Sequence, residues 1–156
     1  MKNKIKTVIE QLEKAWADDL PKTKVEIFNN AKAEFILSHD HQNLCALLSF
    51  CINLSFDTVV YDAAKEAIEI ASHEGNKTMT AIYHLIAGKA RGNYHSRYEF
   101  NQALADPAYL ASIRMDDFKW LAKGPDSRIF GNDLLSFIGI EARRYDVMYD
   151  YLRLMT

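Results

Sequence analysis

The chain has 156 residues, 49% of them hydrophobic and 26% charged, and a formal net charge of −2. A chain of this length and composition forms one globular domain with its own core. The balanced charge argues against a nucleic-acid-binding face, and the apolar content argues against intrinsic disorder. We therefore predict a single domain over residues 1–156 that binds no nucleic acid.

The two ends of the chain bear on its compartment and length. Charged residues follow the basic start before any apolar run develops, so no signal peptide is expected. No stretch of about 18 residues is apolar throughout, so no membrane-spanning segment is expected. Residues 145–155 have helical spacing but no capping residue before the chain stops. This leaves open a natural terminus or a piece of a longer protein.

Apolar residues recur at helical spacing from the start of the chain. A first helix is expected over about residues 3–18, with one buried stripe: Ile5, Val8, Ile9, Leu12 and Trp16. Pro21 follows this helix. Thr23 and Glu26 have capping-box spacing, which predicts a second helix from Thr23 to about Leu37. Its expected buried residues are Val25, Phe28, Ala31 and Phe35.

Two further helices are expected between residues 41 and 74. Residues 41–54 carry no charge beyond the first turn, so this helix should be central and buried. Asp57 can cap the next helix, which should end at Glu74 with Gly75 as its left-handed terminator. Cys45 and Cys51 lie on the first of these helices, too far apart for a disulfide within it, and are expected to be buried free thiols.

A fifth helix is expected to begin near Asn76 and to reach Tyr94 or beyond. Its apolar stripe comprises Met79, Ile82, Tyr83, Ile86, Ala90 and Tyr94. The opposite, polar face could bind a protein or peptide partner, through His84, Arg91 and His95, with Gly88 leaving room for a peptide backbone. The alternative is a solvated helix face on which Gly88 serves close helix packing.

The rest of the chain is less regular. Pro107, Gly124 and Pro125 interrupt residues 98–131, where a short helix is expected over about residues 116–122. A seventh helix should begin at Asn132 or Asp133, and an eighth near residue 145. The inward residues of the seventh are Leu134, Leu135, Ile138 and Ala142. Short connections between helices predict an all-α fold of antiparallel helical hairpins.

One hairpin resembles a tetratricopeptide repeat. Residues 63–71, Ala-Ala-Lys-Glu-Ala-Ile-Glu-Ile-Ala, are similar to the second helix of such a repeat, and residues 73–76 resemble its turn into the next unit. The Trp-Leu-Gly-Tyr signature of the first helix is absent. The resemblance implies hairpins stacked in a tetratricopeptide-like superhelical array.

Catalytic signatures are absent from the sequence. There is no phosphate-binding glycine loop, no His-Glu-x-x-His and no Gly-x-Ser-x-Gly, so we predict no enzyme activity and no cofactor. The best metal candidate is His39 and His41 with Cys45, because His41 and Cys45 are one helical turn apart. The favoured alternative has Asp40 capping a helix and Cys45 in the core, so no metal is predicted.

Two segments resemble the N-terminal helical region of bacterial alpha-2-macroglobulin-like surface proteins. They are residues 16–35, centred on Asp-Leu-Pro-Lys-Thr-Lys-Val-Glu-Ile-Phe, and residues 129–151, which contain Ile-Phe-Gly-Asn-Asp-Leu-Leu-Ser-Phe-Ile-Gly. Many members of that family carry a thioester in a Cys-Gly-Glu-Gln motif. Neither Cys45 nor Cys51 matches it, so no catalytic residue is carried over. The resemblance implies a helical spacer or docking module in the cell envelope or periplasm.

Three hypotheses follow from the sequence. The favoured one is a non-catalytic protein-interaction or spacer module at the front of such an envelope protein. The second is a free-standing cytoplasmic adaptor that binds a peptide along the fifth helix. The third is a small metal-binding protein. A homodimer formed by pairing of the chain ends also stays open.

Overall fold

A computed structural model of the chain describes residues 2–52, 57–92, 111, 114, 116 and 143–155. This part is helical and contains no β-strand, which confirms the all-α prediction for it. Its helices are α1 (Lys2–Ala17), α2 (Pro21–Leu37), α3 (His41–Ile52), α4 (Asp57–His73), α5 (Lys77–Arg91) and α10 (Tyr145–Met155). The helices predicted over residues 116–122 and from Asn132 or Asp133 lie outside the described residues, apart from Asp116.

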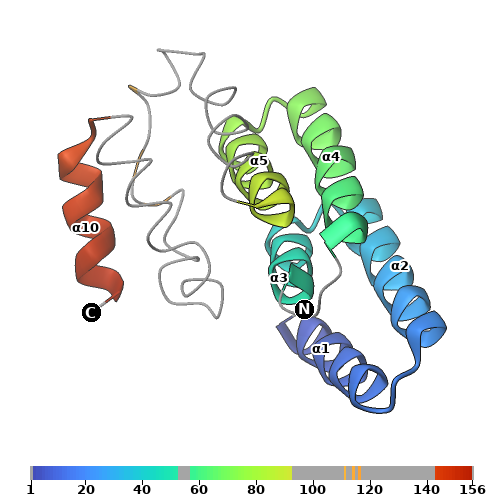
Figure 1. Ribbon diagram of the computed structural model, residues 1–156. Coiled ribbons are helices and arrows are strands. Elements are labelled where there is room, and N and C mark those ends of the chain that lie inside the picture. Colours follow the sequence, from blue (N-terminus) through green and yellow to red (C-terminus); the bar gives the residue numbers. More distant parts are fainter. Residues whose placement is uncertain are drawn as a thin grey trace.

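The first five helices form two rows. Each helix packs against the next one in the chain, and α3 also packs against α1 and α5. Figure 1 shows α1, α3 and α5 along one side and α2 and α4 along the other, with α10 apart from both rows. The central position predicted for the helix that begins at His41 is confirmed, because α3 contacts all four of the other helices.

Three of the connections have the same backbone geometry. In each, an amide bonds to the carbonyl five residues earlier: Leu20 to Ala15, Asp40 to Phe35 and Asn76 to Ala71, all at 2.9 Å. This is the Schellman arrangement, which satisfies carbonyls left open at a helix end. It requires a left-handed residue, and φ is 53° at Asp19, 54° at His39 and 71° at Gly75. Gly75 confirms the predicted terminator, whereas the other two turns use non-glycine residues.

The helices that follow these turns begin in two ways. Asp40 and Asn76 act as N-caps, since their Oδ1 atoms accept hydrogen bonds from the amides three residues later, at 3.2 and 3.1 Å. Leu20 makes no side-chain cap, and α2 instead begins with Pro21 at its first position. The capping box predicted at Thr23 and Glu26 is therefore wrong, because the fixed φ of proline suits the first helical position and starts the helix two residues earlier.

The core of α1 to α5 lies between the two rows, and Val147 on α10 is also buried. The largest fully buried side chains of this core are Tyr83, Phe28, Phe35, Leu12, Leu47, Leu48, Ile82, Leu85 and Ile86. Two residues predicted to be buried are instead exposed: Trp16 is 55% accessible and Val25 37%. Both lie near the end of the α1–α2 hairpin. There the apolar stripe of each helix continues past the last residues that a neighbouring helix covers.

Small residues allow the closest helix pair to form. Ala63, Ala64, Ala67 and Ala71 are buried on α4, which packs more extensively against α5 than any other described pair does. The two cysteines are buried free thiols, as predicted. Helix α5 begins after the Asn76 cap and ends at Arg91, before Gly92 with φ of 97°; Tyr94 lies outside the described residues. Among the described helices, none is long and apolar enough to span a membrane.

Candidate functional site

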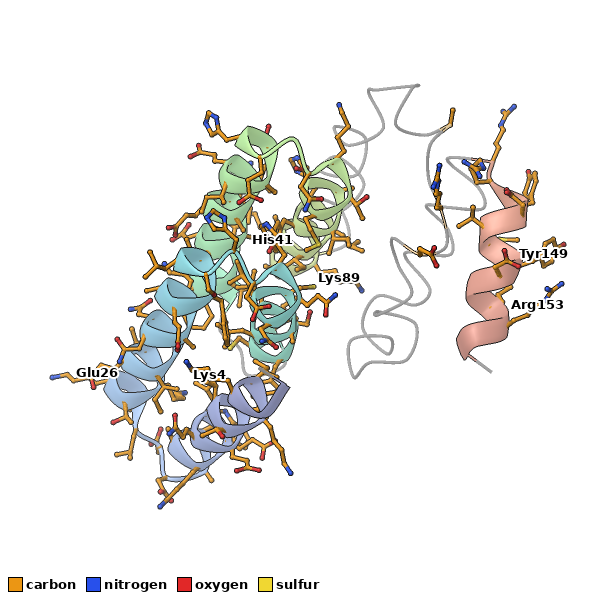
Figure 2. The ribbon with its side chains drawn as sticks, turned by 180° about the vertical axis from the view of Figure 1, so that it is seen from behind. Lys4, Glu26, His41, Lys89, Tyr149 and Arg153 are labelled. Carbon is orange, nitrogen blue, oxygen red and sulfur yellow. The ribbon has the colours of Figure 1, made fainter. Side chains whose placement is uncertain are left out.

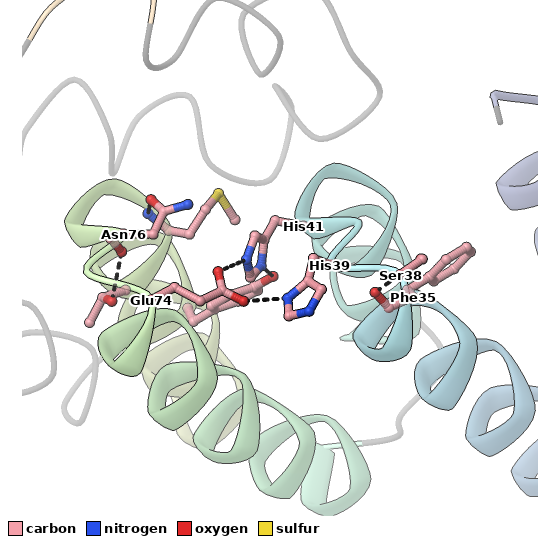
Figure 3. A network of polar contacts seen from close by, with 9 residues as sticks. Phe35, Ser38, His39, His41, Glu74 and Asn76 are labelled. Atoms are coloured by element: carbon pink, nitrogen blue, oxygen red, sulfur yellow. Dashed lines mark hydrogen bonds and ion pairs between the residues drawn. The ribbon is translucent and has the colours of Figure 1, made fainter.

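A polar cluster joins the α2–α3 turn to the end of α4. The carboxylate of Glu74 accepts hydrogen bonds on both oxygens, because an ionised carboxylate can only accept. Nδ1 of His39 lies 2.6 Å from Oε1, and Nε2 of His41 lies 2.8 Å from Oε2. Figure 3 shows the carboxylate between the two rings. Both histidines therefore share one anion, which lies 35 positions after His39 and 33 positions after His41 in the chain.

The hydrogen bonds continue from His41 to the core. Nδ1 of His41 lies 2.8 Å from the hydroxyl of Tyr83, whose side chain is fully buried. A neutral His41 that donates from Nε2 to Glu74 has Nδ1 free to accept, so the Tyr83 hydroxyl donates to it. The order hydroxyl, imidazole, carboxylate satisfies a buried tyrosine that would otherwise lack an acceptor.

The surroundings of Glu74 and Tyr83 shift the pKa values of these two residues in opposite directions. The pKa of Glu74 is lowered, first by the hydrogen bond from His41 and then by that from His39. The pKa of Tyr83 is raised, mainly because burial penalises the phenolate and also because the carboxylates of Glu74 and Asp40 place negative charge nearby. Glu74 thus stays ionised and Tyr83 stays neutral over the ordinary pH range.

A hydroxyl, an imidazole and a carboxylate in this order also occur in nucleophilic catalysis. Here the hydroxyl belongs to Tyr83, which has no accessible surface, so in this conformation a substrate would not reach it. The parts of the cluster open to solvent are the side chains of His39, which is 67% exposed, and Glu74, which is 28% exposed. What the geometry provides is a connection between two turns and a buried helix.

The structure does not bring the candidate metal ligands together. His39 and His41 meet at Glu74, whereas the sulfur of Cys45 lies 4.0 Å from the hydroxyl of Ser49. Within the described residues, no group of three or more His, Cys, Asp or Glu side chains is arranged to hold a metal ion. Cys51 is no better suited, because burial raises its pKa to about 12 and keeps it a thiol.

The three residues predicted to bind a partner have different surroundings. Arg91 is exposed, and its guanidinium lies 3.6 Å from the centroid of the Tyr61 ring. His84 is buried, with 7% of its surface accessible. His95 lies outside the described residues. The alternative of a solvated face is wrong at His84, which is buried, whereas the burial of Gly88 agrees with the close helix packing which that alternative assigned to it.

Glu74 and Tyr83 are members of the cluster that the sequence pattern does not reveal. The pattern places Glu74 only at the end of a helix and Tyr83 only in an apolar stripe. Topology could have linked them, because antiparallel helices place the turn after α2 and the turn after α4 at the same end of the array. A histidine-containing turn beside one with a free carboxylate was the available signal.

Comparison of the chain with models of protein families, with curated proteins and with solved structures found no match.

Proposed function

We propose that the chain is a non-catalytic protein-interaction module whose binding face runs along α1, α3 and the exposed ends of α5. The observation that carries this proposal is the two-row packing, in which α1 contacts α3 and α3 contacts α5 (Figure 1). Helical hairpins stacked in this way, as in tetratricopeptide arrays, use one row for binding partners. The small residues of α4 and the turn at Gly75 support a tetratricopeptide-like array.

The residue to test on this row is Arg91. It is exposed at the end of α5, where its guanidinium lies over the ring of Tyr61 on α4, and its N–H groups can donate to a peptide carboxylate or carbonyl. His84 is a poorer test, because truncating a side chain with 7% exposure would also disturb the core.

Binding can be measured with a displayed library of random peptides as the probe. A photo-crosslinking amino acid at Gln42, exposed on α3, should label the selected peptide, and the same group at Glu69, exposed on α4, should not. Arg91→Ala should weaken binding about tenfold, or 1.4 kcal/mol. Lys22→Ala, an exposed cation on α2, is the control. Labelling from Glu69 alone, or no selected peptide, would contradict the proposal and leave a spacer role.

The host of the module is part of the same proposal. The resemblance over residues 16–35 and 129–151 supports the N-terminal helical part of a bacterial alpha-2-macroglobulin-like envelope protein. Immunoblotting of fractionated source cells should give a band much larger than 17.9 kDa in the envelope fraction. A band at 17.9 kDa in the soluble fraction would overturn this assignment and favour the cytoplasmic adaptor. Light scattering of the purified chain separates a monomer from the homodimer.

A further inference from the structure

The α2–α3 turn carries the two histidines and the α4–α5 turn carries the carboxylate. The contact between these turns depends on that one anion. His39 lies in the turn after α2, His41 is the first residue of α3, and Glu74 directly follows α4. The carboxylate accepts from both rings, at 2.6 and 2.8 Å. Through His41 the contact extends to Tyr83 on α5. One carboxylate therefore ties the start of α3 to the junction of α4 and α5.

The contact has a built-in dependence on the protonation of Glu74. A protonated carboxyl group gains a donor and loses acceptor capacity, while both ring nitrogens that face it are donors. Protonation of the carboxyl group therefore removes at least one of the two hydrogen bonds that it accepts from the histidines.

We propose that His39, His41 and Glu74 form an acid-sensitive latch that holds the α2–α3 turn against the α4–α5 turn and opens when Glu74 takes up a proton. This goes beyond the interaction function and does not depend on it. Opening would free the start of α3 from the end of α4.

The neighbouring charged groups do not replace Glu74. The carboxylate of Asp40 is already engaged, because its oxygens accept from the backbone amide of Asn43 at 3.2 Å and from the Asn43 side chain at 2.7 Å. Cys45 on α3 is not among the groups that shift the pKa of Glu74. Of the described side chains, those that shift the pKa of Glu74 are His41 and His39.

The direction of the pH effect follows from the lowered pKa of Glu74. A carboxyl group with a lowered pKa in the folded state adds stability above its unfolded pKa, and this stability is lost as pH falls through the folded pKa. The latch should therefore stay closed at a pH where an exposed glutamate is already half protonated, and should open below it.

Nuclear magnetic resonance of the whole chain between pH 8 and pH 2 tests the proposal. The carboxyl carbon of Glu74 should titrate with a lower midpoint than that of Glu69, an exposed glutamate on α4. The amide resonances of residues 39–41 and 75–76 should shift with the Glu74 midpoint. In Glu74→Gln, the acid-range shift of residues 39–41 and 75–76 that follows the Glu74 midpoint should be absent.

Two variants separate the latch from a general acid effect. Glu69→Gln should leave the titration of the two turns unchanged. His39→Gln, at a position that is 67% exposed and should fold normally, should move the Glu74 midpoint part of the way toward that of Glu69. The proposal is overturned if Glu74 and Glu69 titrate together, or if residues 39–41 do not follow Glu74.

Discussion

The turn between α1 and α2 and the turn between α2 and α3 have the same backbone but different surroundings. Both use the Schellman arrangement with a non-glycine residue at positive φ, 53° at Asp19 and 54° at His39. Asp19 and the adjacent Leu20 are exposed, whereas His39 bonds to Glu74, which belongs to another hairpin. The backbone of a turn is thus set locally, while its connection to the rest of the fold depends on one side chain.

The same contrast holds in the helices that lead into the two turns. Trp16 precedes the first turn and is 55% exposed; Phe35 precedes the second and is 2% exposed. The first hairpin lies at the end of the two rows, and the second turn lies between hairpins (Figure 1). An aromatic residue near a helix end is therefore buried only where a further hairpin covers it.

The largest expected effect on stability comes from replacing the two aromatic residues just compared. Phe35→Ala should lower the free energy of unfolding by about 3–5 kcal/mol, because it removes a fully enclosed ring and leaves a cavity. Trp16→Ala should cost less than about 1 kcal/mol, since most of that ring is already in water. Urea denaturation followed by circular dichroism measures both. Equal losses would mean that Trp16 is covered in solution.

Much of this fold could be predicted from helical spacing and turn residues. Gly75 predicts a left-handed helix terminator and Asn76 a helix cap. In the structure Gly75 has a positive φ, and the side chain of Asn76 caps α5. Trp16 and Val25 were predicted wrongly because spacing identifies an apolar stripe but not where its cover ends. Asp19 carries no local signal for positive φ as strong as that of glycine.

The candidate site is harder to predict from the sequence than the fold. The pattern drew attention to His39 and His41, but a metal-ligand interpretation paired them with Cys45, which is close in sequence. Their partner Glu74 is 35 residues from His39, and only the antiparallel packing of α3 and α4 brings it there. Figure 2, the reverse view, shows His41 at the end of α3, while Tyr149 and Arg153 project from α10 away from the two rows.

A second prediction concerns the buried end of the cluster. Tyr83→Phe should lower the free energy of unfolding by about 1–2 kcal/mol, because it removes the hydroxyl that donates to Nδ1 of His41 and leaves that nitrogen without its partner. Tyr149→Phe is the matched control, at a position that is 58% exposed on α10, and it should be close to neutral. If Tyr83→Phe is also neutral, the hydroxyl makes no net contribution.

A third prediction isolates backbone strain in the α4–α5 turn. A Cβ at Gly75 would meet nothing within 4 Å, so Gly75→Ala tests only its φ of 71°. It should lower the free energy of unfolding by about 1 kcal/mol, measured by thermal or urea denaturation. Gly75→Asn should cost less, because asparagine enters the left-handed region more readily. Equal costs would indicate an effect other than conformation.

The smallest expected effect compares the two non-glycine turns directly. Asp19→Gly should raise the free energy of unfolding by about 0.5 kcal/mol, because glycine relieves the left-handed strain. His39→Gly relieves the same strain but loses the hydrogen bond to Glu74, an exposed contact worth less than about 1 kcal/mol, so its net effect should be near zero. In the Glu74→Gln variant that hydrogen bond is already weakened. His39→Gly should then raise the free energy of unfolding as much as Asp19→Gly does. Equal gains from both substitutions in the native chain would mean that His39 and Glu74 contribute nothing to the connection between the turns.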